Sequence, residues 1–206
     1  MSENWNLPNL LTAVRIVMVP FFIWMLVAGG PSGEDSMVLR WVAFALFAVA
    51  IYTDKLDGDI ARSRGLVTSF GKIADPIADK LLTGSAFIVL SLLGELWWWV
   101  TVLILVREWG ITLMRLMVLK YGVMPASRGG KLKTVLQAAA LLWLLAPLGP
   151  VLGDWWLWAG WILMAAALVV TLITGADYVL KGLRLRRDSL AGEPSQSSQS
   201  GQSSRD

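Results

Sequence analysis

Residues 10–29 read LLTAVRIVMVPFFIWMLVAG, an apolar run interrupted by a single charged residue, Arg15. About 20 such residues are enough to cross the hydrocarbon core of a bilayer as an α-helix. Five more apolar runs follow, at 37–54, 70–93, 97–119, 132–148 and 155–180. Hydrophobic residues make up 56% of the 206 residues and charged residues 16%, which is unlike a soluble domain. We therefore expect an all-α integral membrane protein with six transmembrane helices.

Lysine and arginine occupy alternate connections between these runs. The connections at 31–36, 94–95 and 149–154 contain neither residue. The other connections and the end of the last run carry Arg62, Arg64 and Lys72, then Lys120, Arg128, Lys131 and Lys133, then Lys181, Arg184, Arg186 and Arg187. Because positively charged loops stay in the cytoplasm, both termini are expected there, in a multi-pass protein of the cytoplasmic membrane. Tryptophans at 97–99 and 155–158 would then anchor the opposite interface.

The end of the chain differs in composition from the rest. Residues 188–206 are rich in Ser, Gln and Gly, and such segments bury too little apolar surface to fold. We expect one helical domain over residues 1–187 and a disordered tail over residues 188–206.

The chain contains no cysteine and no histidine. Disulfides, iron–sulfur clusters and thiolate nucleophiles are therefore excluded. The usual general base and the usual zinc ligand are also missing, which leaves carboxylates for acid–base chemistry and metal binding. Oxygen-only sites suit hard ions such as Mg²⁺ or Mn²⁺.

Aspartates cluster where the second run ends and the third begins, in the segments DKLDGDIAR and GKIADPIADK of residues 54–80. Asp54 and Asp57 are three apart, and Asp75 and Asp79 are four apart. Either spacing places two side chains on one face of a helix. Because the linking segment is short, the two helices are expected to be antiparallel neighbours. The four carboxylates would then converge near the cytoplasmic interface.

Four converging carboxylates repel one another unless cations compensate their charge. Two divalent ions about 4 Å apart, held by shared carboxylates, form an arrangement that stabilises attacking and leaving oxygens in phosphoryl chemistry. Gly58 and Ala61 leave room for a nucleotide to approach the backbone, and Arg62 suits a phosphate oxygen. The alternative is that the aspartates are interfacial charges paired with nearby cations, namely Lys55, Lys72, Lys80 and Arg62.

The two aspartate segments resemble the signature of the CDP-alcohol phosphotransferase family at every fixed position, Asp54-x2-Asp57-Gly58-x2-Ala61-Arg62-x8-Gly71-x3-Asp75-x3-Asp79. The resemblance implies six transmembrane helices, a homodimer and a site that faces the cytoplasm. It implies two metal ions, Mg²⁺ or Mn²⁺, bound by Asp54, Asp57, Asp75 and Asp79. It places the CDP group of the donor substrate at Asp57, Gly58, Ala61, Arg62 and Gly71. It also implies that Asp79 is the base that deprotonates the acceptor hydroxyl.

Cations in the fourth and fifth runs bear on the identity of the acceptor. Arg107 and Arg115 are eight apart, which places both on one helix face, two turns apart. Lys131 and Lys133 follow at the start of the fifth run. A cationic strip that leads to the metal site favours an acceptor with its own phosphate.

Structural interpretations of some of these residues stay open. Arg107 lies near the middle of an apolar run, where an ionised side chain is costly, and would pair with Glu108 or Asp177. Arg128 would be an ordinary loop charge. Asn9 and two residues of the first run, Thr12 and Arg15, are spaced to share one helix face, either beside the same site or as a plain helix start.

Three further segments, at 6–15, 107–115 and 130–134, resemble the branch of this family whose acceptor is glycerol 3-phosphate. The resemblance implies transfer of the phosphatidyl group of CDP-diacylglycerol to that acceptor. The products would be phosphatidylglycerophosphate and CMP, in phospholipid biosynthesis. It also implies that the acceptor phosphate is bound by Arg107, Arg115, Lys131 and Lys133.

Other functions remain to be weighed. Within the family, inositol phosphate or phosphatidylglycerol is the alternative acceptor. In a different class, the four aspartates would be the transport site of a divalent-cation transporter. Transport sites lie near the bilayer midplane between inverted repeats, whereas these carboxylates are expected at the cytoplasmic end and no repeat is visible. The sequence therefore favours an enzyme.

Overall fold

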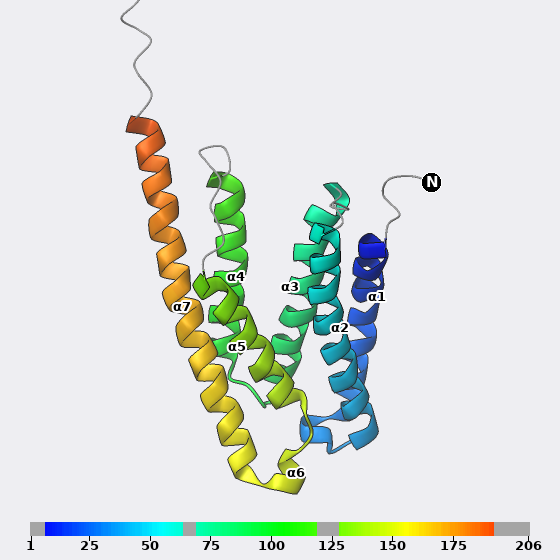
Figure 1. Ribbon diagram of the computed structural model, residues 1–206. Coiled ribbons are helices and arrows are strands. Elements are labelled where there is room, and N and C mark those ends of the chain that lie inside the picture. Colours follow the sequence, from blue (N-terminus) through cyan, green and yellow to red (C-terminus); the bar gives the residue numbers. More distant parts are fainter. Residues whose placement is uncertain (1–6, 64–68, 119–127, 192–206) are drawn as a thin grey trace, which may run out of the picture.

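The computed structural model describes residues 7–63, 69–118 and 128–191, and within these ranges the chain is helical and contains no strand (Figure 1). The long helices are α1 (Leu7–Gly29), α2 (Met37–Ser63), α3 (Ser69–Leu92), α4 (Trp98–Val118), α5 (Arg128–Leu145) and α7 (Asp154–Ala191). Two short elements connect them, η1 (Pro31–Gly33) and α6 (Gly149–Leu152). The all-α prediction is confirmed, and each predicted apolar run corresponds to one long helix.

Three of the described helices are long and apolar enough to cross a membrane: Leu10–Gly29 within α1, Met37–Asp54 within α2 and Asp154–Arg184 within α7. The hydropathy of α3 and α4 is lowered by internal charged residues, and α5 begins with cations. Those charges include the residues predicted to form the site. The membrane character predicted from composition is therefore supported for three of the described helices, and the six transmembrane spans remain a prediction.

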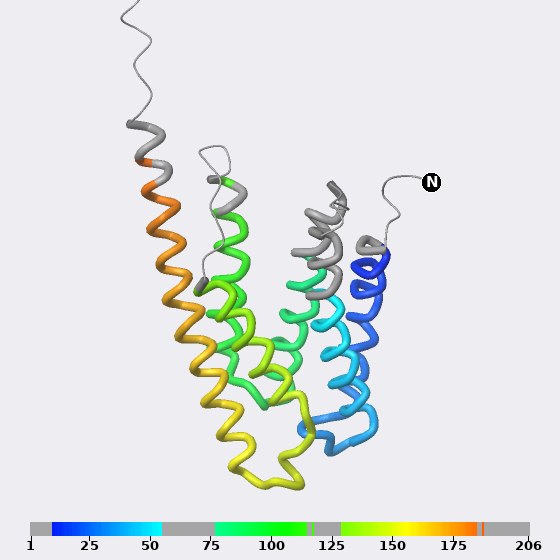
Figure 2. The backbone as a smooth tube through the Cα atoms, viewed as in Figure 1, coloured from blue at the N-terminus to red at the C-terminus, as the bar shows by residue number. Residues whose placement is uncertain are grey.

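The long helices run alternately in opposite directions, so α1 begins and α7 ends at the same end of the bundle (Figure 1). They form two groups, because α1 packs against α2 and α3, and α7 packs against α4 and α5. Figure 2 shows that the groups meet near η1 and α6 and stand farther apart toward the end where α1 begins. The last turns of α2 and the first turns of α3, which carry the predicted aspartates, lie toward that second end.

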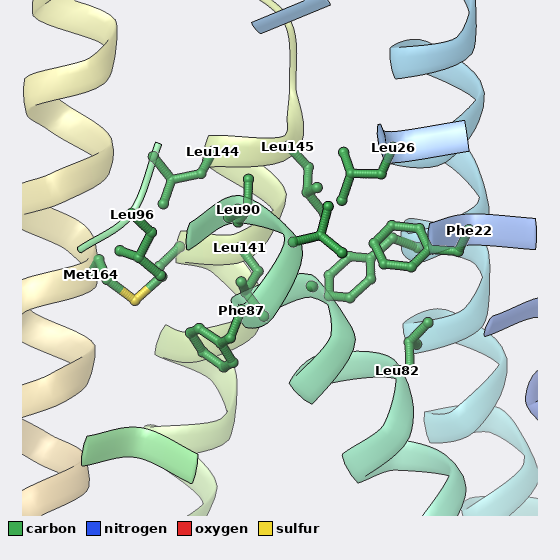
Figure 3. Packing of buried hydrophobic residues seen from close by; sticks show 14 of the residues in the cluster. Phe22, Leu26, Leu82, Phe87, Leu90, Leu96, Leu141, Leu144, Leu145 and Met164 are labelled. Carbon is green, nitrogen blue, oxygen red and sulfur yellow. The ribbon is translucent and has the colours of Figure 1, made fainter. Parts of the chain in front are cut away.

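The apolar core lies in the half of the bundle where the two groups meet. Phe22 and Leu26 of α1 and Leu90 of α3 belong to one cluster, to which α2, α4, α5 and α7 also contribute side chains (Figure 3). Phe22 also stacks on Phe47 of α2 with ring centroids 5.5 Å apart. The core thus fixes the two groups against each other at one end and leaves the charged residues at the other.

The turn between α3 and α4 is formed by Gly94, whose φ of 75° is a conformation that other residues rarely adopt. The backbone N–H groups of Glu95 and Leu96 both donate to the carbonyl of Leu90, at 2.9 and 3.2 Å. These bonds end α3 and turn Glu95 toward the interior, where its side chain is buried.

Arg40 of α2 is completely buried near this turn, with 0% of its surface exposed. Its Nη2 donates to the Glu95 carboxylate at 2.5 Å and to the carbonyl of Leu144 at 3.0 Å. Its Nε donates to the carbonyl of Leu145 at 3.1 Å, and its Nη1 to that of Gly30 at 3.2 Å. One guanidinium therefore connects the ends of α1 and α5 with α2 and the α3–α4 turn. The residues Arg40 and Glu95, with the carbonyls they bind, are called the Arg40 hub below.

Tryptophans gather at the same end of the bundle as the Arg40 hub. The side chains of Trp97–Trp99, Trp155 and Trp158 are exposed, as expected of residues that anchor a membrane interface. Trp156 behaves differently, since it stacks on Trp143 with ring centroids 3.9 Å apart. Trp143 also donates its indole N–H to the carbonyl of Trp156 at 2.9 Å, which joins α5 to α7.

The last helix is longer than the predicted run at 155–180. α7 continues to Ala191, past residue 187, where the helical domain was expected to end. Residues 192–206 lie outside the described part of the chain, so disorder of the tail remains a prediction.

Candidate active site

The helices required by the aspartate spacing are present. Asp54 and Asp57 both lie in α2, and Asp75 and Asp79 both lie in α3, which runs antiparallel to α2 (Figure 1). The side chains of Asp57 and Asp75 lie outside the described residues. The same holds for four of the positions predicted to bind CDP, although their backbone is helical: Gly58, Ala61, Arg62 and Gly71.

Asp54 and Asp79 are the two predicted metal ligands whose side chains are described. Asp79 lies within electrostatic range of Asp54, although the two belong to different helices. Arg15 of α1, with 2% of its side chain exposed, donates from Nη1 to Asp54 Oδ1 at 2.6 Å. The structure therefore brings two of the four aspartates together and places the first helix beside them.

Two lysines also lie within electrostatic range of Asp79, Lys80 of α3 and Lys133 of α5. Lys80 donates to Thr112 Oγ1 at 2.6 Å and stands 5.7 Å from the centroid of the Trp109 ring, both on α4. Asp79 is therefore bordered by cations from two helices. α3 and α4 are joined next to it.

Glu108 of α4 lies at the centre of the predicted cationic strip. Its Oε1 accepts from Nζ of Lys133 at 2.6 Å and from Nη1 of Arg107 at 3.0 Å. Nη2 of Arg107 donates to Thr174 Oγ1 of α7 at 2.9 Å. We call Arg107, Glu108 and Lys133 the Glu108 cluster; it joins α4, α5 and α7.

Arg107 also packs closely against α7. A Cβ atom added at Gly175 would lie only 3.1 Å from Cγ and Nε of Arg107, so this position accommodates the arginine because it has no side chain. Of the two pairings left open by the sequence, Arg107 forms the one with Glu108. Asp177 pairs instead with Lys181 at 2.6 Å.

The remaining predicted acceptor residues are less well defined. Lys131 is exposed in the first turn of α5. Arg115 lies in α4, but its side chain falls outside the described residues, as does that of Arg128. The structure thus joins Arg107 and Lys133 and leaves Arg115 and Lys131 as predictions.

The donor atoms present fit a hard divalent cation. Asp54 and Asp79 supply carboxylate oxygens from two helices, and like charges within electrostatic range of each other are stabilised by a nearby cation. Among the described side chains there is no group of three metal-binding residues, since Asp57 and Asp75 are not part of that set. The predicted four-aspartate site is therefore compatible with the structure and still rests on the sequence.

The sequence alone does not indicate a role in the site for Glu108, Thr112 or Thr174. Glu108 could have been identified from the sequence, since an acid beside an arginine inside an apolar run needs a partner. No feature of the sequence singles out the two threonines. Their hydroxyls also bond to backbone carbonyls four residues earlier, as threonines commonly do in membrane helices.

Comparison with known proteins defines the class. Residues 5–173 match the profile of the CDP-alcohol phosphatidyltransferase family, and the chain belongs to that family. It is 51% identical over 179 residues to the probable phosphatidylglycerophosphate synthase of Mycobacterium tuberculosis H37Rv, covering 87% of this chain and 82% of that protein.

Two more distant relatives carry a more explicit name, CDP-diacylglycerol–glycerol-3-phosphate 3-phosphatidyltransferase. The protein of Bacillus subtilis is 38% identical, over 68% of this chain and 77% of the relative. The protein of Escherichia coli K12 is 33% identical, over 85% of this chain and 94% of the relative. The similarity therefore covers both the aspartate segments and the Glu108 cluster.

Proposed function

We propose that this chain is a phosphatidylglycerophosphate synthase, which transfers the phosphatidyl group of CDP-diacylglycerol to glycerol 3-phosphate and releases CMP. The observation that carries the proposal is the position of Asp79. It lies within electrostatic range of Asp54 and also of Lys133 and Glu108. This neighbourhood supports the proposal that the aspartates of the family signature and the cations suited to a phosphate belong to one site. The names of the relatives support the same reaction.

In the proposed reaction, Asp79 accepts the proton of the acceptor hydroxyl, whose oxygen attacks the β-phosphorus of the donor. The phosphoanhydride bond to CMP breaks as the new P–O bond forms. Two divalent ions held by Asp54, Asp57, Asp75 and Asp79 would neutralise the pyrophosphate and the leaving CMP. Arg107 and Lys133 hold the acceptor phosphate, so that positioning contributes a large part of the rate enhancement.

The membrane arrangement belongs to the same proposal. Six transmembrane helices would place both termini and the site in the cytoplasm, in agreement with α1 beginning and α7 ending at one end of the bundle. Residues 1–187 would form the catalytic domain and 188–206 a tail. The CDP group would lie along α2 and the start of α3, at Asp57, Gly58, Ala61, Arg62 and Gly71. A homodimer is proposed from the family resemblance alone.

The decisive experiment supplies purified protein with CDP-diacylglycerol and Mg²⁺ and compares glycerol 3-phosphate, inositol phosphate and phosphatidylglycerol as acceptors. We expect CMP release with glycerol 3-phosphate alone. Release with another acceptor would show that the assignment of the acceptor is wrong and would leave the proposed role of the aspartates unchanged. Uptake of divalent ions into vesicles with the protein reconstituted in their membrane, together with no CMP release in the presence of any acceptor, would instead indicate a transporter.

Removal of metal is expected to stop the reaction. Excess EDTA should reduce CMP release to background, because the aspartates alone bring negative charge toward a negatively charged pyrophosphate. Addition of Mg²⁺ or Mn²⁺ beyond the EDTA concentration should restore it. Turnover that persists in EDTA at full rate would contradict the metal site.

Replacement of Arg107 by glutamine is expected to raise the KM for glycerol 3-phosphate about tenfold or more, since a charge-assisted hydrogen bond contributes about 1.5–3 kcal/mol. The KM for CDP-diacylglycerol should change less than about twofold, because that substrate binds at the aspartate segments. Lys181→Gln is the control, as Lys181 is an exposed cation of α7 paired only with exposed Asp177 in the described structure. Equal changes in both KM values would remove Arg107 from the acceptor site.

A further inference from the structure

A single oxygen of Glu108 accepts from two cations that come from different helices. Oε1 lies 2.6 Å from Nζ of Lys133 and 3.0 Å from Nη1 of Arg107. About 10% of either cationic side chain is exposed, and 20% of that of Glu108. Two cations this close and this poorly solvated repel each other strongly unless a carboxylate lies between them. The spacing of the pair therefore depends on Glu108.

Lys133 has a second carboxylate within electrostatic range, that of Asp79. The lysine stem is flexible and its ammonium is a compact charge, so the ammonium binds to the nearest strong hydrogen-bond acceptor within its reach. With Glu108 present, Nζ is held at the α4 carboxylate. Without it, the ammonium loses the partner that lies 2.6 Å away and is no longer held beside Arg107.

Arg107 is fixed on its other side. Nη2 donates to Thr174 at 2.9 Å, and the side chain rests against the backbone of Gly175. Glu108 is therefore bonded to one cation that α7 holds in place, Arg107, and to one with a flexible side chain, Lys133. Loss of its charge is expected to displace the lysine more than the arginine.

We propose that Glu108 is a positioning residue: it holds Lys133 beside Arg107 as a paired receptor for the acceptor phosphate. The inference rests on the proposed function, because it assigns these cations to the acceptor. The inference goes beyond the proposed function because it gives Glu108 a role other than joining α4, α5 and α7. In this role Glu108 acts through the two cations and not by touching the acceptor.

The test is a set of KM measurements on the full-length protein. Glu108→Gln keeps the shape of the side chain and removes its charge, and we expect the KM for glycerol 3-phosphate to rise about tenfold or more. The KM for CDP-diacylglycerol should stay within about twofold. Glu108→Asp restores the charge and should return the acceptor KM most of the way to the wild-type value. The exposed pair offers the matched control, Asp177→Asn, with both KM values unchanged.

The link through Lys133 is tested in a double-mutant cycle. Once Lys133→Met has removed the ammonium, the further change Glu108→Gln should raise the acceptor KM less than about threefold. If the two effects multiply in full, or if Glu108→Gln alone leaves the acceptor KM unchanged, the inference is wrong. A rise shared equally by both substrates would assign Glu108 to general packing and would also overturn it.

Failure of the proposed function gives a different result. Wild-type protein that releases no CMP with glycerol 3-phosphate refutes the function before any variant is made. Wild-type turnover combined with an unaffected Glu108→Gln enzyme refutes the inference alone.

Discussion

Replacement of Asp79 by asparagine is expected to lower kcat by about 10³-fold or more. The change removes the proton acceptor, a loss that alone corresponds to about 10²–10⁴-fold, and it also removes a carboxylate from the proposed metal site. Asparagine has nearly the same volume, so the packing of α3 should persist. CMP release with saturating substrates and Mg²⁺ measures the effect, and a melting temperature close to that of wild type shows that the protein is folded.

The control for Asp79 removes a carboxylate elsewhere at the same end of the bundle. Asp177→Asn breaks an exposed pair with Lys181 and should leave kcat within about twofold of wild type. A fully active Asp79→Asn enzyme would refute the assignment of Asp79 as the base. Residual activity that recovers with high Mg²⁺ would indicate that its main contribution is to metal binding.

The largest expected effect on stability comes from the opposite end of the molecule. Glu95→Gln leaves the completely buried guanidinium of Arg40 without a counter-charge, and breaking a buried pair from one side costs about 3–5 kcal/mol. For a chain of this size the melting temperature should fall by about 10 °C. Thermal unfolding in detergent, followed by fluorescence of the 12 tryptophans, measures the shift.

Two comparisons show whether the ion pair itself is responsible. Asp177→Asn, which breaks the exposed pair, should shift the free energy of unfolding by less than about 1 kcal/mol. Below its melting temperature, Glu95→Gln should still release CMP, because no residue of the Arg40 hub belongs to the proposed site. Unchanged melting of Glu95→Gln would mean that the carbonyls of Gly30, Leu144 and Leu145 stabilise the guanidinium without help.

The sequence was sufficient to predict the helices because each lies in a long apolar run whose ends carry charges or turn residues. It predicted the antiparallel helices that carry Asp54 and Asp79, and it identified Arg107 as a cation that needs a partner inside an apolar run. These predictions rest on periodicity and on the cost of burying charge, which act locally along the chain.

Other features depend on which helices pack together, and local patterns carry no such information. Nothing in the local sequence marks Arg40 or Glu95 as buried, since Arg40 lies near the start of an apolar run and Glu95 in a connection between two runs. Only the packing of four chain segments around them shows a buried pair. The choice of Glu108 over Asp177 as the partner of Arg107 was open for the same reason, since it depends on how α4, α5 and α7 cross.

The position of the Arg40 hub has a mechanical consequence. From residue 40 to Asp54, α2 rises about 20 Å, so the hub and the proposed metal ligand Asp54 are separated by a stiff length of helix. A tilt of about 5° around the hub would carry the far end of that length by about 2 Å. A helix that is fixed near one end is displaced most at its other end. Small rotations at a firmly packed end are enough to adjust the distances between catalytic groups, and the apolar core need not be repacked.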